Sequence, residues 1–140
     1  MKISAKGIYG VQTMVALARG RDENLQSVKT IAEEQGIPQA FLEQVISPLR
    51  KKGLVKSVRG ASGGYALAKS PSDISVGEIL RELEGPLAAA DCLITPCDNA
   101  EICAMHALWQ MVFDGINGFL DSITLQDVLN LNGISCRKNG

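Results

Sequence analysis

The 140-residue sequence contains no long hydrophobic run, although 46% of its residues are hydrophobic. None of its apolar stretches approaches the roughly 18 uninterrupted residues of a membrane-spanning helix. The first residues, Met1 to Lys6, lack the apolar region and the cleavage site of a secretion signal, so we expect a cytoplasmic protein with no membrane partner. Internal repeats and low-complexity segments are also missing. The length then predicts one domain, or one domain with an appended element.

An excess of charge of either sign is absent as well, because the formal net charge is only −1. This average hides a strong asymmetry. Residues 1–70 contain eleven lysines and arginines against five acidic residues, whereas residues 71–140 contain three against ten. A basic half joined to an acidic half predicts that one face of the protein meets a polyanion.

Histidine is almost absent, and the single histidine lies beside three of the four cysteines. Within fifteen residues the chain has the spacing C-x4-C-x5-C-x2-H, formed by Cys92, Cys97, Cys103 and His106. We call these four residues the ligand set, because thiolate and imidazole are the donors that bind zinc or an iron–sulfur centre. In a chain with no export signal, clustered cysteines indicate ligands or redox thiols rather than disulfides. The fourth cysteine, Cys136, stands apart, and we expect it to be a free, exposed thiol.

The first half of the chain has the pattern of a winged helix. Apolar periodicity and end signals predict helices over residues 4–19, 28–35 and 39–52, the last two joined by a tight turn as in a helix-turn-helix. Pro48 is expected to bend or divide the third helix, which leaves residues 39–47 to enter a DNA groove. Two β-prone runs, 54–58 and 65–68, flank a glycine-rich tip and predict a hairpin wing.

Three further helices are predicted over residues 76–84, 105–123 and 125–131. The 105–123 helix has an apolar seam at alternating steps of three and four, formed by Trp109, Val112, Ile116, Phe119 and Ile123. Met105, Leu108, Met111 and Leu120 widen that seam. It either covers the protein's own core or forms a homodimer, and the complete winged-helix core favours a homodimer through residues 105–123.

The predicted fold class is therefore mainly α with a small β-hairpin wing, a winged helix-turn-helix followed by a long dimerisation helix. We expect four parts. Residues 1–84 form the DNA-binding region, and residues 85–104 form a cysteine-rich, cluster-binding loop. Residues 105–131 form the dimerisation helix and a short last helix, and residues 132–140 form a flexible tail.

Five positive charges fall within ten residues that contain no acid, at Arg50, Lys51, Lys52, Lys56 and Arg59. On a docked winged helix these positions meet the phosphate backbone of double-stranded DNA. Arg59 begins the wing tip and is a candidate for an adjacent minor groove. The tip glycines, including Gly63 and Gly64, permit the backbone to approach phosphates closely.

Base reading is predicted for polar residues on the exposed face of the third helix, at Gln39, Glu43 and Gln44. Glutamine can form a bidentate pair of hydrogen bonds with adenine, and glutamate can accept a hydrogen bond from cytosine. Glu43 has an equal alternative, since a carboxylate near a helix start also stabilises the helix dipole. Phe41 is expected in the core, with contact to a thymine methyl group as the alternative.

These residues carry a resemblance that spans almost the whole chain. The segments Lys6-Gly7-x-Tyr9, Phe41-Leu42-Glu43-Gln44, Ser57-Val58-Arg59-Gly60, Gly63-Gly64-Tyr65 and Val76-Gly77-Glu78 are similar to the Rrf family of bacterial winged-helix regulators. The cysteines followed by His106-Ala107-Leu108-Trp109 resemble the iron–sulfur regulators of that family most. The resemblance implies a homodimer with a 2Fe–2S cluster on each subunit, bound by the ligand set. It also implies a repressor or dual regulator of cluster-assembly genes.

Two alternatives stay open. The ligand set is also an ordinary structural zinc set, which would make the chain a zinc-stapled DNA-binding or interaction protein without a redox sensor. Nitric-oxide-sensing members of the family also have three cysteines, so a nitric-oxide-responsive relative is the other alternative. No orienting partner accompanies Cys103 and His106 as a thiol–base pair, so we expect neither an enzyme nor a small-molecule substrate.

Overall fold

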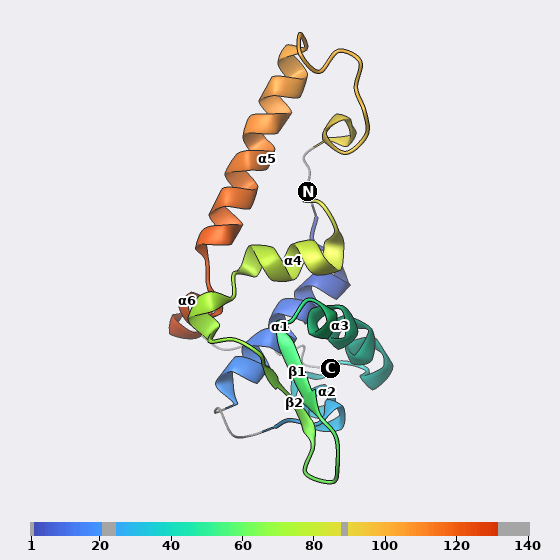
Figure 1. The fold of residues 1–140 in the computed structure, drawn as a ribbon, viewed down its shortest axis with the longest axis vertical. Coiled ribbons are helices and arrows are strands. Elements are labelled where there is room, and N and C mark those ends of the chain that lie inside the picture. The colour runs from blue at the N-terminus through green and yellow to red at the C-terminus, as the bar shows by residue number, and fades with distance from the viewer. Residues whose placement is uncertain (1, 21–24, 88–89, 132–140) are drawn as a thin grey trace.

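The computed structural model describes residues 2–20, 25–87 and 90–131 (Figure 1). Three helices and a hairpin come first: α1 (Ala5–Arg19), α2 (Val28–Gln35), α3 (Gln39–Lys51), β1 (Val55–Val58) and β2 (Gly64–Leu67). The rest consists of η1 (Pro71–Asp73), α4 (Val76–Glu84), η2 (Asp91–Leu93), α5 (Ala104–Ser122) and α6 (Leu125–Asn130). The predicted winged helix and long helix are confirmed. The predicted tail and Cys136 lie outside the described residues.

Side-chain caps explain where the helices begin. Ser4, Ser27, Ser75 and Thr124 each accept a hydrogen bond from a backbone N–H of the first helical turn. At Ser75 and Thr124 an acidic residue three positions later returns a bond to the cap, which completes a capping box. These local signals are visible in the sequence, so the predicted helix starts agree with the structure.

The third helix differs from its prediction at Pro48. This residue lies inside α3, but the helix is not divided and continues to Lys51. Proline removes one backbone donor, yet the next turn closes normally, with Lys52 N–H donating to the Pro48 carbonyl at 3.0 Å. The apolar face of α3 is fully buried on both sides of Pro48, and this packing holds the helix together.

The wing is an antiparallel hairpin in which Val55 pairs with Leu67 and Val58 with Gly64. Its second strand also meets the segment before α2. The N–H of Tyr65 donates to the Gln26 carbonyl at 2.8 Å, and the N–H of Gln26 donates back at 3.0 Å. The wing is thereby fixed to the helix-turn-helix.

The main core lies between α1, α2, α3, α4 and the start of β1, and α6 completes it. Its fully buried members are large and apolar: Met14, Ile31, Leu42, Val45, Leu49, Leu54, Ile74, Ile79 and Leu125. A smaller cluster of Val76, Leu80 and Leu87 packs against Leu120 and Ile123. This second cluster joins the base of α5 to α4.

Beyond that base, α5 extends away from the winged helix as an arm (Figure 1). None of its residues is fully buried. The segment before it passes through η2, which contacts α5. No helix among the described residues is long and apolar enough to cross a membrane.

Candidate nucleic-acid interface and metal-ligand loop

The predicted base-reading residues lie together on one exposed face of α3. Gln39, Glu43 and Gln44 are exposed, while the opposite face of α3 is buried in the core. We call this side the outer face; it also includes the exposed Ala40 and the half-buried Ser47. Phe41 points away from it and packs edge-on against Tyr9, with ring centroids 5.3 Å apart. Phe41 is thus half-buried and packs against the main core rather than on the outer face.

The predicted phosphate contacts are exposed at the end of α3 and on the wing: Arg50, Lys51, Lys52, Lys56 and Arg59. Within the described ranges, none of these five cations forms an ion pair with a carboxylate. An unpaired, exposed cation can meet a phosphate without first breaking an internal contact. The arrangement is therefore suited to a polyanion.

Two glycines of the wing are needed for packing within the protein itself. A Cβ on Gly63 would collide with the Val58 carbonyl, and a Cβ on Gly64 would collide with the backbone of Gln26. Both positions thus need glycine for packing inside the protein. Their predicted role, a close approach of backbone to phosphate, stays a prediction.

The ligand set is spread over the loop and the first turn of α5. Cys92 lies in η2, Cys97 in the irregular segment that follows, Cys103 at the N-cap of α5 and His106 in the first turn of α5. All four are half-buried, and the three thiols are free. The structure thus places Cys103 and His106 on one helix start, as the spacing predicts.

Two observations bear on whether these residues fit a metal centre. Nδ1 of His106 is buried and has no hydrogen-bond partner among the described residues, and a buried nitrogen without a partner is costly unless something binds it. On the other hand, no three His, Cys, Asp or Glu side chains of the described ranges come together closely enough to hold a metal ion. The donors fit such a group by their chemistry, and the observed loop conformation leaves them apart.

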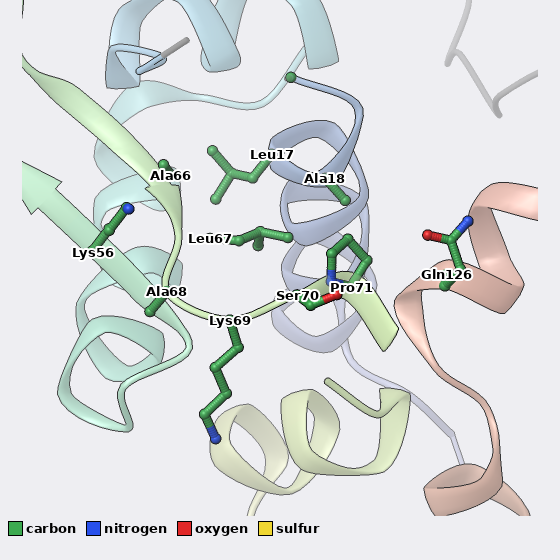
Figure 2. A pocket seen from close by; sticks show the side chains of 11 residues that line it. Leu17, Ala18, Lys56, Ala66, Leu67, Ala68, Lys69, Ser70, Pro71 and Gln126 are labelled. Atoms are coloured by element: carbon green, nitrogen blue, oxygen red, sulfur yellow. The ribbon is translucent and has the colours of Figure 1, made fainter. Parts of the chain in front are cut away.

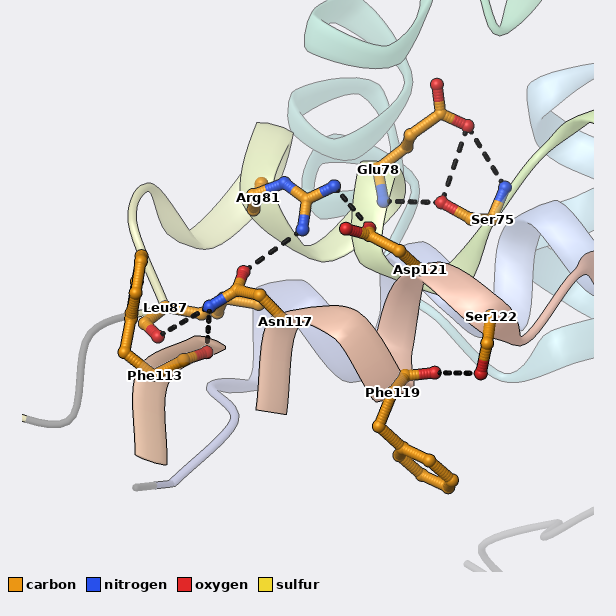
Figure 3. A network of polar contacts seen from close by, with 9 residues as sticks. All are labelled: Ser75, Glu78, Arg81, Leu87, Phe113, Asn117, Phe119, Asp121 and Ser122. Carbon is orange, nitrogen blue, oxygen red and sulfur yellow. Dashed lines mark hydrogen bonds and ion pairs between the residues drawn. The ribbon is translucent and has the colours of Figure 1, made fainter. Parts of the chain in front are cut away.

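A polar network that was not predicted ties the loop to the rest of the molecule (Figure 3). Arg81 of α4 pairs with Asp121 and donates to Asn117, both on α5. Asn117 in turn donates to the Leu87 carbonyl at 3.3 Å and to the Phe113 carbonyl at 2.9 Å. Leu87 lies at the start of the loop, so one asparagine joins α4, α5 and the loop. The available sequence signal was that Arg81 is the only lysine or arginine in an acidic stretch from Asp73 to Asp127.

The apolar seam of the arm is largely uncovered in a single chain. Exposure reaches 66% at Phe119, 72% at Met111 and 53% at Met105. Only Leu120 and Ile123, at the base, pack on the second cluster. An uncovered apolar helix face of this length is typical of a protein–protein contact.

A cavity of about 570 Å³ lies between the end of α1, the wing and α6 (Figure 2). Its two cations, Lys56 and Lys69, point in different directions in this view. A small-molecule site usually has a few convergent polar groups, which this cavity does not provide.

Comparison with known proteins gives a consistent family assignment. Residues 3–131 match Rrf2, described as an iron-dependent transcriptional regulator. The HTH-type transcriptional regulator CymR of Bacillus subtilis is 44% identical over 128 residues, which cover 91% of this chain and 89% of CymR. The HTH-type transcriptional regulator IscR of Escherichia coli is 40% identical over 131 residues, 93% of this chain and 81% of IscR.

Solved structures of both kinds of regulator share the fold. CymR, described as the global cysteine regulator of B. subtilis, has a TM-score of 0.79 at 41% identity over 95% of this chain and 99% of CymR. IscR of T. potens has a TM-score of 0.75 at 44% identity over 96% of this chain and 94% of IscR.

Proposed function

The chain belongs to the Rrf2 family of winged-helix transcriptional regulators. We propose that it is a homodimeric, DNA-binding regulator. Its affinity for its operator would depend on a 2Fe–2S cluster bound by the ligand set. The chemistry is that of a binding protein, not of an enzyme. One observation carries the sensor part of the proposal. The donor set ends on His106, whose buried Nδ1 has no partner among the described residues.

Different residues of the chain would read the bases, bind the phosphates and form the dimer. Gln39, Glu43 and Gln44 on the outer face read base edges in a major groove. The cations at the end of α3 and on the wing bind phosphates, with Arg59 at the tip. The apolar seam of α5 pairs two chains, so that two copies of α3 meet the two halves of a palindromic operator.

The ligand set connects this DNA-binding surface to a signal. A bound cluster supplies an oxidisable, removable link between the loop and the start of α5. The loop begins at Leu87, which Asn117 joins to α5 and to Arg81 of α4. A change in the loop therefore acts on the joint between the arm and the winged helix. It alters DNA affinity only as far as binding favours one arrangement of that joint.

The main alternative to this proposal is a regulator like CymR that does not use a cluster, since CymR is similar to this chain and is described as a cysteine regulator. The ligand set favours the cluster reading, because three thiols and an imidazole in fifteen residues provide a full set of four donors.

The test is the visible spectrum of protein purified without oxygen, with iron, sulfide and zinc measured on the same sample. We expect a red-brown protein with about two iron and two sulfide ions per chain, the content of a 2Fe–2S centre. A colourless protein with one zinc ion per chain would mean that the ligand set forms a structural zinc site and not a sensor. Colourless, metal-free protein that binds DNA equally well with and without iron and sulfide would contradict the sensor and favour a CymR-like regulator. Bleaching of the colour by nitric oxide, with loss of DNA binding, would favour the nitric-oxide-responsive alternative.

A further inference from the structure

A shallow groove runs along the outer face of α3, and one of its walls comes from a different helix. The groove has a volume of about 630 Å³ and is lined by Lys6, Ala40, Glu43, Gln44, Ser47 and Pro48. All of these residues except Lys6 belong to α3. We propose that Lys6, in the first turn of α1, is a further DNA-binding residue that holds a backbone phosphate beside the recognition helix. The inference rests on the proposed DNA-binding surface and adds a contact to it.

The backbone under Lys6 is held in place by contacts on both sides of it. Ser4, the N-cap of α1, donates its N–H to Oε1 of Glu84 at 2.8 Å, and its hydroxyl bonds to the same oxygen. A Cβ on Gly7 would collide with that carboxylate oxygen, so the glycine leaves room for the Glu84 side chain in this contact. The first turn of α1 is thus fixed against α4, and Lys6 starts from a rigid position.

The charge of Lys6 is available to a ligand. Among the described residues Lys6 has no carboxylate within ion-pair distance, although Glu43 lines the same groove. Lys6 is half-buried, so its aliphatic stem can lie along the groove wall while the ammonium group reaches solvent. A half-buried, unpaired cation on a rigid turn is well suited to a phosphate.

The position of Lys6 would also give a helix in the major groove a contact to the second phosphate strand. A major groove about 12 Å wide has a phosphate strand along each side, and contacts to both strands fix the register of the inserted helix. The cations of the wing lie on one side of α3. The start of α1 lies on the side of α3 away from the wing tip (Figure 1), so Lys6 can meet the other strand.

Lys6→Ala tests the proposal with two DNA probes. One is a duplex selected from a random library by the wild-type protein, and the other is an unrelated duplex of the same length. Since one phosphate contact accounts for a slope of about 0.9 in log K against log salt, we expect the slope to fall by about one. At 0.1 M salt, affinity for both duplexes should fall by a similar factor of roughly five to ten.

Two matched variants complete the experiment. Lys6→Arg should keep the slope, and Lys69→Ala should leave both slope and affinity unchanged, because Lys69 is exposed but lies outside this groove. An unchanged slope for Lys6→Ala, with its fold retained by circular dichroism, would overturn the proposal. A loss confined to the selected duplex would also overturn it, because Lys6 would then act on base reading rather than on phosphate.

The proposed function can fail separately. Arg59→Ala is expected to lower the slope by about one through the wing. If wild type binds no duplex, or if Arg59→Ala has no effect, the DNA-binding surface itself is wrong. If both behave as expected and Lys6→Ala does not, only the role of Lys6 is wrong.

Discussion

At the residue scale, the ligand set separates a sensor from a structural staple. Cys97 lies in an irregular part of the loop, is half-buried and has no role in a helix or in the main core. We therefore expect Cys97→Ala to keep a folded dimer, with the free energy of unfolding within about 0.5 kcal/mol of the cluster-free wild type. The visible colour and bound iron should be lost. Urea unfolding and iron analysis measure the two effects.

Unfolding of the Cys97→Ala protein would show that the metal site holds the fold together, which is the zinc-staple reading. Ser62→Ala is a suitable control for colour and stability, because Ser62 lies in another exposed loop, the wing tip, and is not part of the ligand set. It should change neither colour nor stability.

Individual residues also mark how far the sequence could be interpreted. The type and spacing of lysines, arginines and clustered cysteines indicate what they can bind, so the candidate site could be proposed from the sequence. Asn117 could not, because its role comes from hydrogen bonds with Arg81 and with the Leu87 carbonyl, 36 and 30 residues away in the sequence. Gly64 was assigned to DNA, but its packing against Gln26 is visible only in three dimensions.

At the element scale, α3 shows how packing overrides a local signal. Proline inside a helix costs about 3 kcal/mol relative to alanine, and this favoured a bend or a break. Leu42, Val45 and Leu49 are fully buried along α3, and each contributes roughly 1.5–3 kcal/mol. The buried face outweighs the missing hydrogen bond. Helix ends, by contrast, were predictable because the caps act within a single turn.

Pro48→Ala should therefore stabilise the protein. Alanine restores the N–H that can donate to the Gln44 carbonyl, and the greater freedom of the unfolded chain offsets part of the gain. We expect the free energy of unfolding to rise by about 1–2 kcal/mol in urea titrations. Ser47→Ala, whose N–H is already present, should change it by less. A destabilised Pro48→Ala protein would mean that the backbone around Pro48 is shaped for the proline ring.

The joint between α4 and α5 offers a second test at this scale. A Cβ on Gly77 would collide with Oδ1 of Asp121, the partner of Arg81. We expect Gly77→Ala to displace the Asp121 carboxylate from Arg81. The lost ion pair, worth about 0–1 kcal/mol, offsets the gain of about 1 kcal/mol that alanine brings to a helix, so the free energy of unfolding should change little. In an Asp121→Ala background the same substitution should stabilise the protein by about 1 kcal/mol, since the clash is gone and no ion pair is lost. Equal effects in both backgrounds would contradict this account of the joint.

At the scale of the whole molecule, the charge asymmetry of the sequence corresponds to two parts of the structure. The basic half forms the winged helix, and the acidic half forms α4, the loop and the arm. The arm is joined to the winged helix at its base. Its base is held where Val76 N–H donates to the Ile123 carbonyl at 2.8 Å and Leu125 N–H donates to the Ile74 carbonyl at 2.9 Å. An arm fixed at its base can transmit a change in the loop to the winged helix.

The same geometry leaves the apolar seam of the arm exposed, and we expect it to pair with a second copy of the chain. Phe119 is 66% exposed, and together with Met111 and Met105 it makes a face that a lone chain would present to water. A pair of such helices would bury this face with knobs-into-holes contacts. Phe119→Glu places a charge at that contact, where it would be desolvated without a partner. We expect monomers in light scattering, with the helix content of the wild type.

DNA binding should weaken together with dimerisation, because a monomer engages only one half-site. The expected loss is at least a hundredfold at protein concentrations below the new dimer dissociation constant, since the two-fold linkage is removed. Gln126→Glu adds the same charge on α6, outside the arm, and should leave the dimer and its operator affinity intact. If Phe119→Glu remains dimeric, the pairing surface lies elsewhere. The spacing of the two α3 helices, which a palindromic operator reads, would then be set by another part of the molecule.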